Sequence, residues 1–172
     1  RRNVELIRTV REAVGPDVEL AADAYMGWTP DYAIRMIRML EDAGLDLAWV
    51  EEPLIPDDHE GYARVKAEVR TPISGGEHEF TRYGFRQLIE RRSVDILQPD
   101  VKRCGGITEA RKIWALAAAH DLPVVKLRFE ALVDRQMFAA GINFRRAHRP
   151  LVLPRQARAH VCKQRPQAFD VR

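Results

Sequence analysis

Residues 1–125 alternate short apolar runs with longer amphipathic segments, and this rhythm leaves few folds open to the chain. Each run spans four to six residues, and each segment after it carries apolar residues at helical spacing. Strict alternation with short connections predicts an α/β fold, with helices packed on a parallel sheet. The predicted strands are Val18–Asp23, Leu47–Glu51, Ile73–Glu77, Asp95–Gln98 and Leu122–Val125.

The segments between the strands carry helix start and stop signals. Thr29 is a favourable N-cap, Pro30 suits the first helical position, and Gly44 suits the end of that helix. A further helix precedes the first strand, and three more follow the later strands. We expect these helices to begin at Val4, Asp58, Thr81 and Thr108.

The rhythm alone is compatible with an open doubly wound sheet or with a closed barrel. Neither a G-x-G-x-x-G nor a G-x-x-x-x-G-K-[ST] motif follows a predicted strand. Dinucleotide-binding and P-loop folds are therefore disfavoured.

Net charge divides the chain near residue 125. Residues 1–125 carry 17 Lys/Arg and 22 Asp/Glu, whereas residues 126–172 carry 11 Lys/Arg and 3 Asp/Glu. The second segment lacks the alternating rhythm. We interpret it as a basic divergent tail, with a frameshifted or misannotated terminus as the favoured origin and disorder as one outcome. The competing interpretation is a nucleic-acid-binding arm, but its arginines form no regular helical face and no aromatic pattern accompanies them.

Four carboxylates stand at, or shortly after, the ends of successive predicted strands. They are Asp23, Glu51, Glu77 and Asp100, separated by 28, 26 and 23 residues. In a barrel, the carboxyl ends of all strands meet on one face. Crowded carboxylates repel each other unless a divalent cation such as Mg²⁺ lies among them. Taken singly, each acid could be a helix N-cap or a loop residue, and strand alternation assigns Glu52 to a structural ion pair.

Several short motifs resemble the mandelate racemase subgroup of the enolase superfamily, and most closely its sugar-acid dehydratases of the L-rhamnonate dehydratase type. The resemblance covers about residues 3–125, with order and spacing both matching. The motifs are Asp23-Ala24-Tyr25-Met26, Trp49-Val50-Glu51-Glu52-Pro53, Gly76-Glu77-His78, Gln98-Pro99-Asp100 and Cys104-Gly105-Gly106.

The resemblance implies a partial (β/α)8 barrel, about strands 3–7, over residues 1–125. It implies that Asp23, Glu51 and Glu77 bind Mg²⁺, and that Tyr25 and His78 contact a sugar acid. For His78 a structural role is the alternative. The implied reaction is dehydration to a 2-keto-3-deoxy acid through an enediolate, in a homo-oligomer. Cys104 and Cys162 are too few for a disulfide framework and fit a reducing cytoplasm.

The resemblance also implies a catalytic histidine on the strand after Asp100, oriented by that carboxylate. Here Lys126 and Leu127 follow Val125, and no histidine occurs between Val125 and His148. The family's lysine-bearing strand and capping domain would precede Arg1. We therefore expect an inactive fragment. A racemase, a cycloisomerase, or a non-catalytic metal-binding module with a basic arm are the alternative functions.

Overall fold

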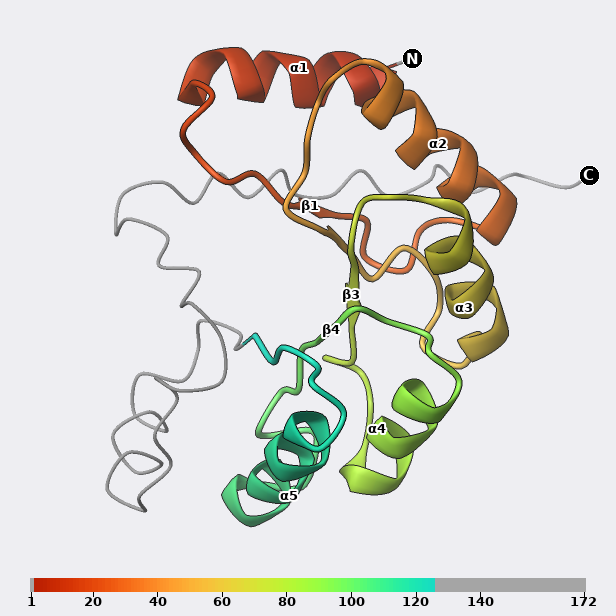
Figure 1. Cartoon of the computed structure of the whole chain (residues 1–172), viewed down its shortest axis with the longest axis vertical. Coiled ribbons are helices and arrows are strands. Elements are labelled where there is room, and N and C mark those ends of the chain that lie inside the picture. Colours follow the sequence, from red (N-terminus) through yellow and green to blue (C-terminus); the bar gives the residue numbers. More distant parts are fainter. Residues whose placement is uncertain (1, 126–172) are drawn as a thin grey trace, which may run out of the picture.

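The computed structural model describes residues 2–125, which form a parallel sheet with helices along one side (Figure 1). Strands and helices alternate along the chain, as the sequence predicts. The elements are α1 (Arg2–Val14), β1 (Ala22–Asp23), α2 (Pro30–Asp42), β2 (Val50–Glu51), α3 (His59–Glu68), β3 (Ile73–Gly75), α4 (Thr81–Glu90), β4 (Ile96–Leu97) and α5 (Ile107–Ala118).

The four strands lie in the order β1-β2-β3-β4, and every neighbouring pair is parallel. An open doubly wound sheet would reverse its strand order at a switch point, and this sheet does not. Sequential order with one helix per crossover is the arrangement of a β/α barrel. The predicted partial barrel is confirmed over this part of the chain.

The regular ladders are shorter than the predicted strands, but backbone hydrogen bonds continue past their ends. The amide of Ala48 donates to the Leu20 carbonyl (2.8 Å), and that of Ala24 donates to the Glu51 carbonyl (2.9 Å). The fifth predicted strand is reduced to one parallel bridge between Leu97 and Val124.

Local capping chemistry explains where the helices begin. The Thr29 side chain accepts from the Tyr32 amide and Pro30 follows it, so this predicted start is confirmed. Asp58 likewise caps α3 by accepting from the Gly61 amide. The predicted start at Thr108 is one residue late, because α5 begins at Ile107 after Gly106, whose φ of 86° suits a glycine.

The core lies between the sheet and the inner faces of the helices. One fully buried side chain from each of α2 to α5 contributes to it: Ile37, Val65, Phe85 and Ile113 are each 0% exposed. Burying each such side chain stabilises the fold by roughly 1.5–3 kcal/mol.

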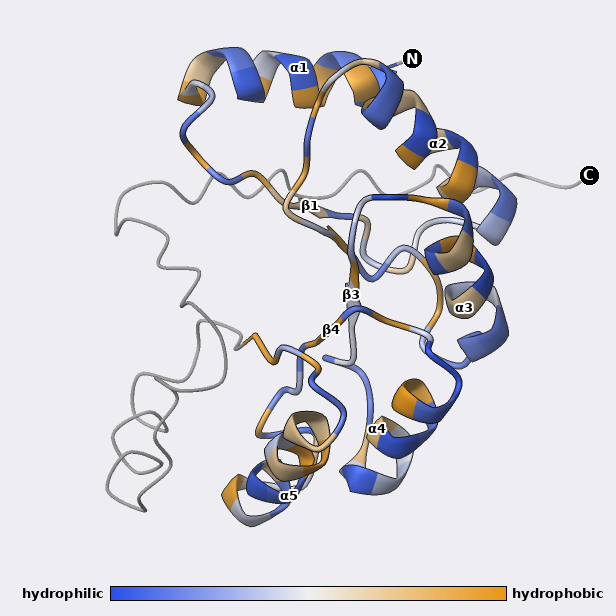
Figure 2. Cartoon of the chain, viewed as in Figure 1, coloured by the Kyte–Doolittle hydropathy of each residue, from blue (hydrophilic) through white to orange (hydrophobic). Residues whose placement is uncertain are grey.

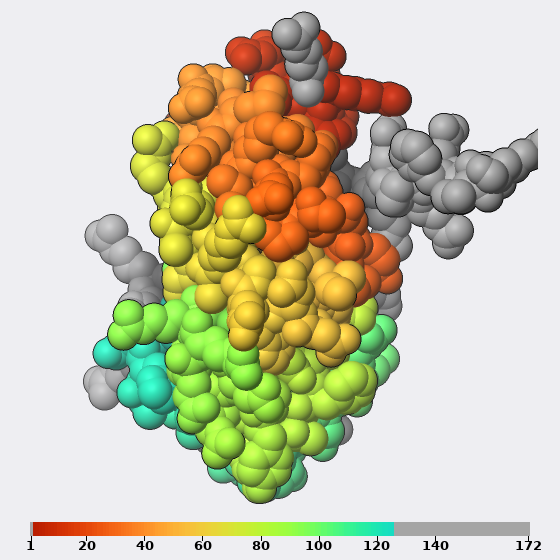
Figure 3. Space-filling view, turned by 90° about the vertical axis from the view of Figure 1, so that its right-hand side faces the viewer, coloured from red at the N-terminus to blue at the C-terminus, as the bar shows by residue number. Residues whose placement is uncertain are grey.

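Figure 2 shows hydrophobic residues gathered in the strands and along one side of the helices. Figure 3 views the right-hand side of Figure 1 and shows the surface following chain order, from red and orange at the top to green at the bottom. None of the helices within residues 2–125 is long and apolar enough to cross a membrane.

The outer edge of β1 has no partner strand within residues 2–125, and we predict that the isolated chain self-associates through it. The amides of Ala22 and Ala24 bond to β2, so the Ala21 amide points to the open edge. An Ala21→Pro substitution removes that donor while sparing the β1–β2 ladder. We expect it to weaken self-association about 5-fold in sedimentation velocity, since one hydrogen bond contributes about 1 kcal/mol. A wild-type chain that stays monomeric and melts cooperatively would contradict this prediction.

Candidate functional site

Asp23 and Glu51 end adjacent strands in matching register. Asp23 pairs with Glu51 across β1 and β2, and Glu51 pairs with Ser74 across β2 and β3. Paired residues in neighbouring parallel strands project to the same face of a sheet. Both carboxylates therefore stand side by side at the carboxyl end of the sheet, and Glu77 follows β3 by two residues at that same end.

A buried glutamine orients the carboxylate of Glu51. The Gln98 side-chain amide donates to Glu51 Oε2 (3.0 Å), and the Trp49 indole donates to the same oxygen (3.3 Å). Ser74 in turn donates to Gln98 Oε1 (2.9 Å). Gln98 is only 2% exposed. Gln98 was not among the predicted site residues, although a polar side chain directly after the apolar pair Ile96-Leu97 was the available signal.

Glu52 and His78 form the ion pair that strand alternation predicts for Glu52. Glu52 Oε2 lies 2.7 Å from His78 Nδ1, and Glu52 is only 2% exposed. Burial raises the pKa of Glu52, and the adjacent His78 offsets part of that rise. The Tyr25 ring meets the His78 ring edge-on, with centroids 5.9 Å apart. The two predicted substrate-binding residues are thus in contact.

Glu77 lies in the field of three other carboxylates. Burial raises the pKa of Glu77 to about 7, with further contributions from the negative charges of Glu52, Glu51 and Asp23 and an opposing contribution from His78. Ionising a carboxyl group whose pKa is raised in this way costs free energy. All three predicted metal ligands are therefore electrostatically coupled at one end of the sheet.

Within residues 2–125, Glu52, Glu77 and His78 bring three possible metal-ligand atoms close together, and Asp23 and Glu51 are not part of this group. One ligand atom from each lies within 4.8 Å of the other two. This group shares Glu77 with the predicted set of Asp23, Glu51 and Glu77. A divalent cation fits this end of the sheet, because it would lower the cost of charging Glu77 among its neighbours. Carboxylate oxygens are ligands that Mg²⁺ prefers.

The loops after β1 and β2 are held in a conformation that side chains rarely adopt. Tyr25, Met26 and Glu52 have φ angles of 45°, 60° and 38°. The Met26 amide donates to the Glu52 carbonyl (2.6 Å), which ties the two loops together. Non-glycine residues with positive φ persist only where the surrounding structure enforces them, and they often occur at functional sites.

Asp100 follows β4 and shapes its own loop. Its Oδ1 accepts from the Lys102 amide (2.7 Å), and its backbone carbonyl accepts from the Cys104 amide (2.8 Å). The predicted partnership with a base concerns the positions of Lys126 and Leu127, which lie outside the described residues, as do His148 and His160.

Successive parallel strands with interleaved helices, and a carboxylate cluster at their carboxyl ends, define this protein as part of a β/α barrel with its candidate site at the usual end. Comparison with known families narrows this class. The chain belongs to the enolase C-terminal domain-like family, whose model matches residues 1–167.

Individual relatives align with a shorter part of the chain. The L-rhamnonate dehydratase of Saccharopolyspora erythraea is 49% identical over 125 residues, which are 72% of this chain and 32% of that protein. The D-galactarolactone cycloisomerase of Agrobacterium fabrum is 42% identical over 123 residues, which are also 72% of this chain and 32% of that protein. The L-talarate dehydratase of Polaromonas sp. JS666, in a crystal structure complexed with Mg and L-glucarate, is 36% identical to this chain in sequence. The two structures match with a TM-score of 0.72. The match covers 76% of this chain and 36% of that one. The chain thus spans about a third of the length of these relatives.

We predict that Glu77→Gln stabilises the full chain when no divalent cation is present. The pKa of Glu77 rises from 4.5 to about 7 on folding, so the native state binds more protons than the unfolded state between these pH values. The contribution of Glu77 to stability therefore falls as pH rises through this window and reaches its full cost above it. We expect a gain on the order of 1–3 kcal/mol at pH 8 in urea unfolding, and little gain near pH 4.5. Equal gains at both pH values would contradict the electrostatic origin.

Proposed function

We propose that this chain carries the metal-binding part of a Mg²⁺-dependent sugar-acid dehydratase, with Asp23, Glu51 and Glu77 as the metal ligands. The observation that carries the proposal is the carboxylate cluster, in which Glu77 is charged at a cost that a bound cation would remove. When bound, Mg²⁺ supplies positive charge that stabilises the carboxylate of a sugar acid and the enediolate left by loss of its α-proton.

The surrounding side chains have supporting roles in this proposal. Gln98 and Trp49 donate to Glu51 Oε2 and so keep the other oxygen available for a cation. Glu52 engages His78 Nδ1, which leaves Nε2 of His78 to meet a substrate oxygen. Tyr25 packs edge-on against that ring and is 44% exposed, so it is accessible from the solvent side of the site.

L-Rhamnonate, or a sugar acid like it, is the proposed substrate, since the dehydratase relative is 49% identical to this chain over the aligned residues. A second candidate reaction is cycloisomerisation, because a cycloisomerase is 42% identical over a similar span. The relatives share this scaffold, so the choice between these reactions depends on residues that act on the substrate. Dehydration needs an acid that protonates the departing 3-hydroxyl.

Residues 126–172 are proposed to be a divergent tail. The alignments with the two relatives cover only 125 and 123 residues of this chain, which supports the proposal. The family model, in contrast, continues to residue 167. Resequencing the coding region tests the frameshift interpretation. A proline–histidine pair encoded in another frame directly after Val125 would support it, and a verified frame with no such pair would overturn it.

We predict that the full chain binds Mg²⁺ and that Asp23→Asn, Glu51→Gln and Glu77→Gln each abolish binding measured by isothermal titration calorimetry. Loss of one of three charged ligands removes most of the attraction for a hard cation. Glu90→Gln is the matched control, because Glu90 is an exposed carboxylate at the far end of α4. Wild-type affinity in the three site variants would rule out this ligand set.

We also predict no detectable dehydration of L-rhamnonate by this chain, even with saturating Mg²⁺. The position proposed for the base is occupied by Leu127, which has no titratable group, and the guanidinium of Arg128 stays protonated near neutral pH, so it has no free lone pair with which to accept the proton. A coupled assay for 2-keto-3-deoxy acids checks this. Turnover that Asp100→Asn abolishes would show that another group of the chain replaces the histidine.

A further inference from the structure

The loops that carry Glu77 and Asp100 lead directly into two neighbouring helices. Glu77 precedes the start of α4 at Thr81 by four residues, and Asp100 precedes the start of α5 at Ile107 by seven. The relative placement of these two carboxylates therefore depends on how the first turns of α4 and α5 are joined.

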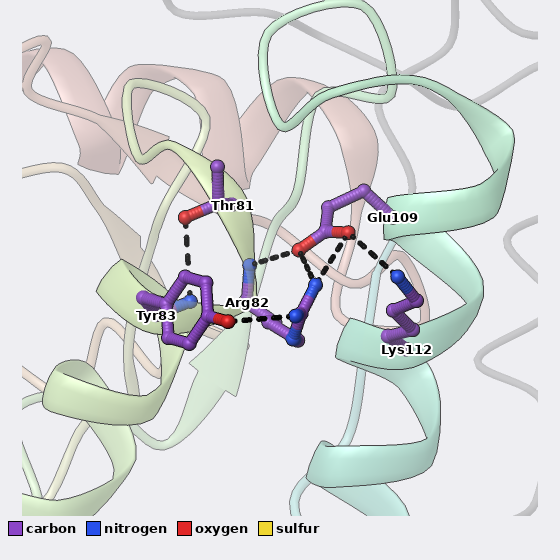
Figure 4. Close-up of polar contacts among 5 residues, drawn as sticks. All are labelled: Thr81, Arg82, Tyr83, Glu109 and Lys112. Carbon is purple, nitrogen blue, oxygen red and sulfur yellow. Dashed lines mark hydrogen bonds and ion pairs between the residues drawn. The ribbon is translucent and has the colours of Figure 1, made fainter.

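Arg82 and Glu109 join these two turns (Figure 4). Arg82 Nη1 donates to both oxygens of Glu109, at 2.9 Å each, and the Arg82 backbone amide donates to Glu109 Oε1 at 2.9 Å. The Glu109 side chain is 13% exposed. Three hydrogen bonds between one residue pair fix both distance and orientation more tightly than a single exposed ion pair can.

Neighbouring groups hold Arg82 itself in place. Its guanidinium lies 4.4 Å from the centroid of the Tyr83 ring, and Arg82 Nη2 donates to the Tyr83 hydroxyl (2.7 Å). Lys112 contacts Glu109 Oε2 from the following turn of α5 (3.4 Å). The charged pair is thus fixed from both helices.

The same junction reaches the loop of Asp100 through the backbone. The Thr81 amide donates to the Cys104 carbonyl (3.2 Å), and Cys104 bonds back to the Asp100 carbonyl. Gly105 lies against Glu109, where an added Cβ would be 3.2 Å from Glu109 Cβ, and its φ of 112° favours glycine. The loop after β4 is therefore shaped around the glutamate.

We propose that Arg82 and Glu109 are positioning residues that lock the loop of Glu77 to the loop of Asp100, so that both carboxylates face one site. The inference rests on the proposed function, because that function gives the two carboxylates a common site. The link that Arg82 and Glu109 make between the two loops does not depend on that function. The inference assigns Arg82 and Glu109 a role in the geometry of the site, although neither belongs to the carboxylate cluster.

The test uses the full chain with Arg82→Met, Glu109→Gln and the control Arg64→Met. Arg64 forms an ion pair with Asp31 between α2 and α3 (2.6 Å), away from both loops. Glu109→Gln keeps an oxygen for the Arg82 amide and loses the charge, so it should have the smaller effect. We expect Mg²⁺ affinity to fall roughly 3-fold to 10-fold in Arg82→Met and to stay unchanged in Arg64→Met.

Amide hydrogen exchange separates this inference from the proposed function. Exchange at Thr81 and Cys104 should be roughly 10-fold faster in Arg82→Met than in wild type, and unchanged in Arg64→Met. If the wild-type chain bound no Mg²⁺, the proposed function would fail, whereas faster exchange in both loops would still support the lock. Exchange in Arg82→Met no faster than in Arg64→Met would overturn it. Mg²⁺ affinity that stays at the wild-type level while both loops exchange faster would also overturn it, because the lock would then not serve the site.

Discussion

Repulsion among carboxylates at the carboxyl end of the sheet is the constraint on which the rest of the site depends. Asp23 and Glu51 are in register, and charging Glu77 costs free energy first because the group is partly buried and then because Glu52, Glu51 and Asp23 lie near it. A fold tolerates such a cluster only if other interactions hold it together. Here the sheet ladder, the Glu52–His78 ion pair and the hydrogen bonds to Glu51 provide them.

The supporting interactions also explain why the backbone accepts unfavourable conformations. Glu52 and Met26 both have positive φ, and the hydrogen bond between the Met26 amide and the Glu52 carbonyl joins their loops. Strain of this kind costs on the order of 1–3 kcal/mol per residue and persists only when packing enforces it. Two residues after Glu52, Leu54 is 1% exposed and its carbonyl accepts from the buried Tyr62 hydroxyl, which holds the chain there in place.

This chain spans about a third of the length of its relatives, and within that third the described residues hold four successive strand ends, each followed by its helix. Such a piece can present metal ligands without presenting every group that acts on a substrate, because in a β/α barrel the reacting groups come from several different strands. The family membership and the fold are therefore established for this chain, but neither of them defines one particular reaction.

The sequence by itself determined the alternation of strands and helices, the caps at Thr29 and Asp58, and the position of acids at strand ends. These features follow from local rules of spacing and hydrogen bonding. Only the tertiary structure decided the burial of Glu52 against His78, the contact of Gln98 with Glu51, and the link between Arg82 and Glu109. These partners lie 26, 47 and 27 residues apart in the chain. No local pattern encodes such pairs, because they form only when successive strands and helices pack side by side.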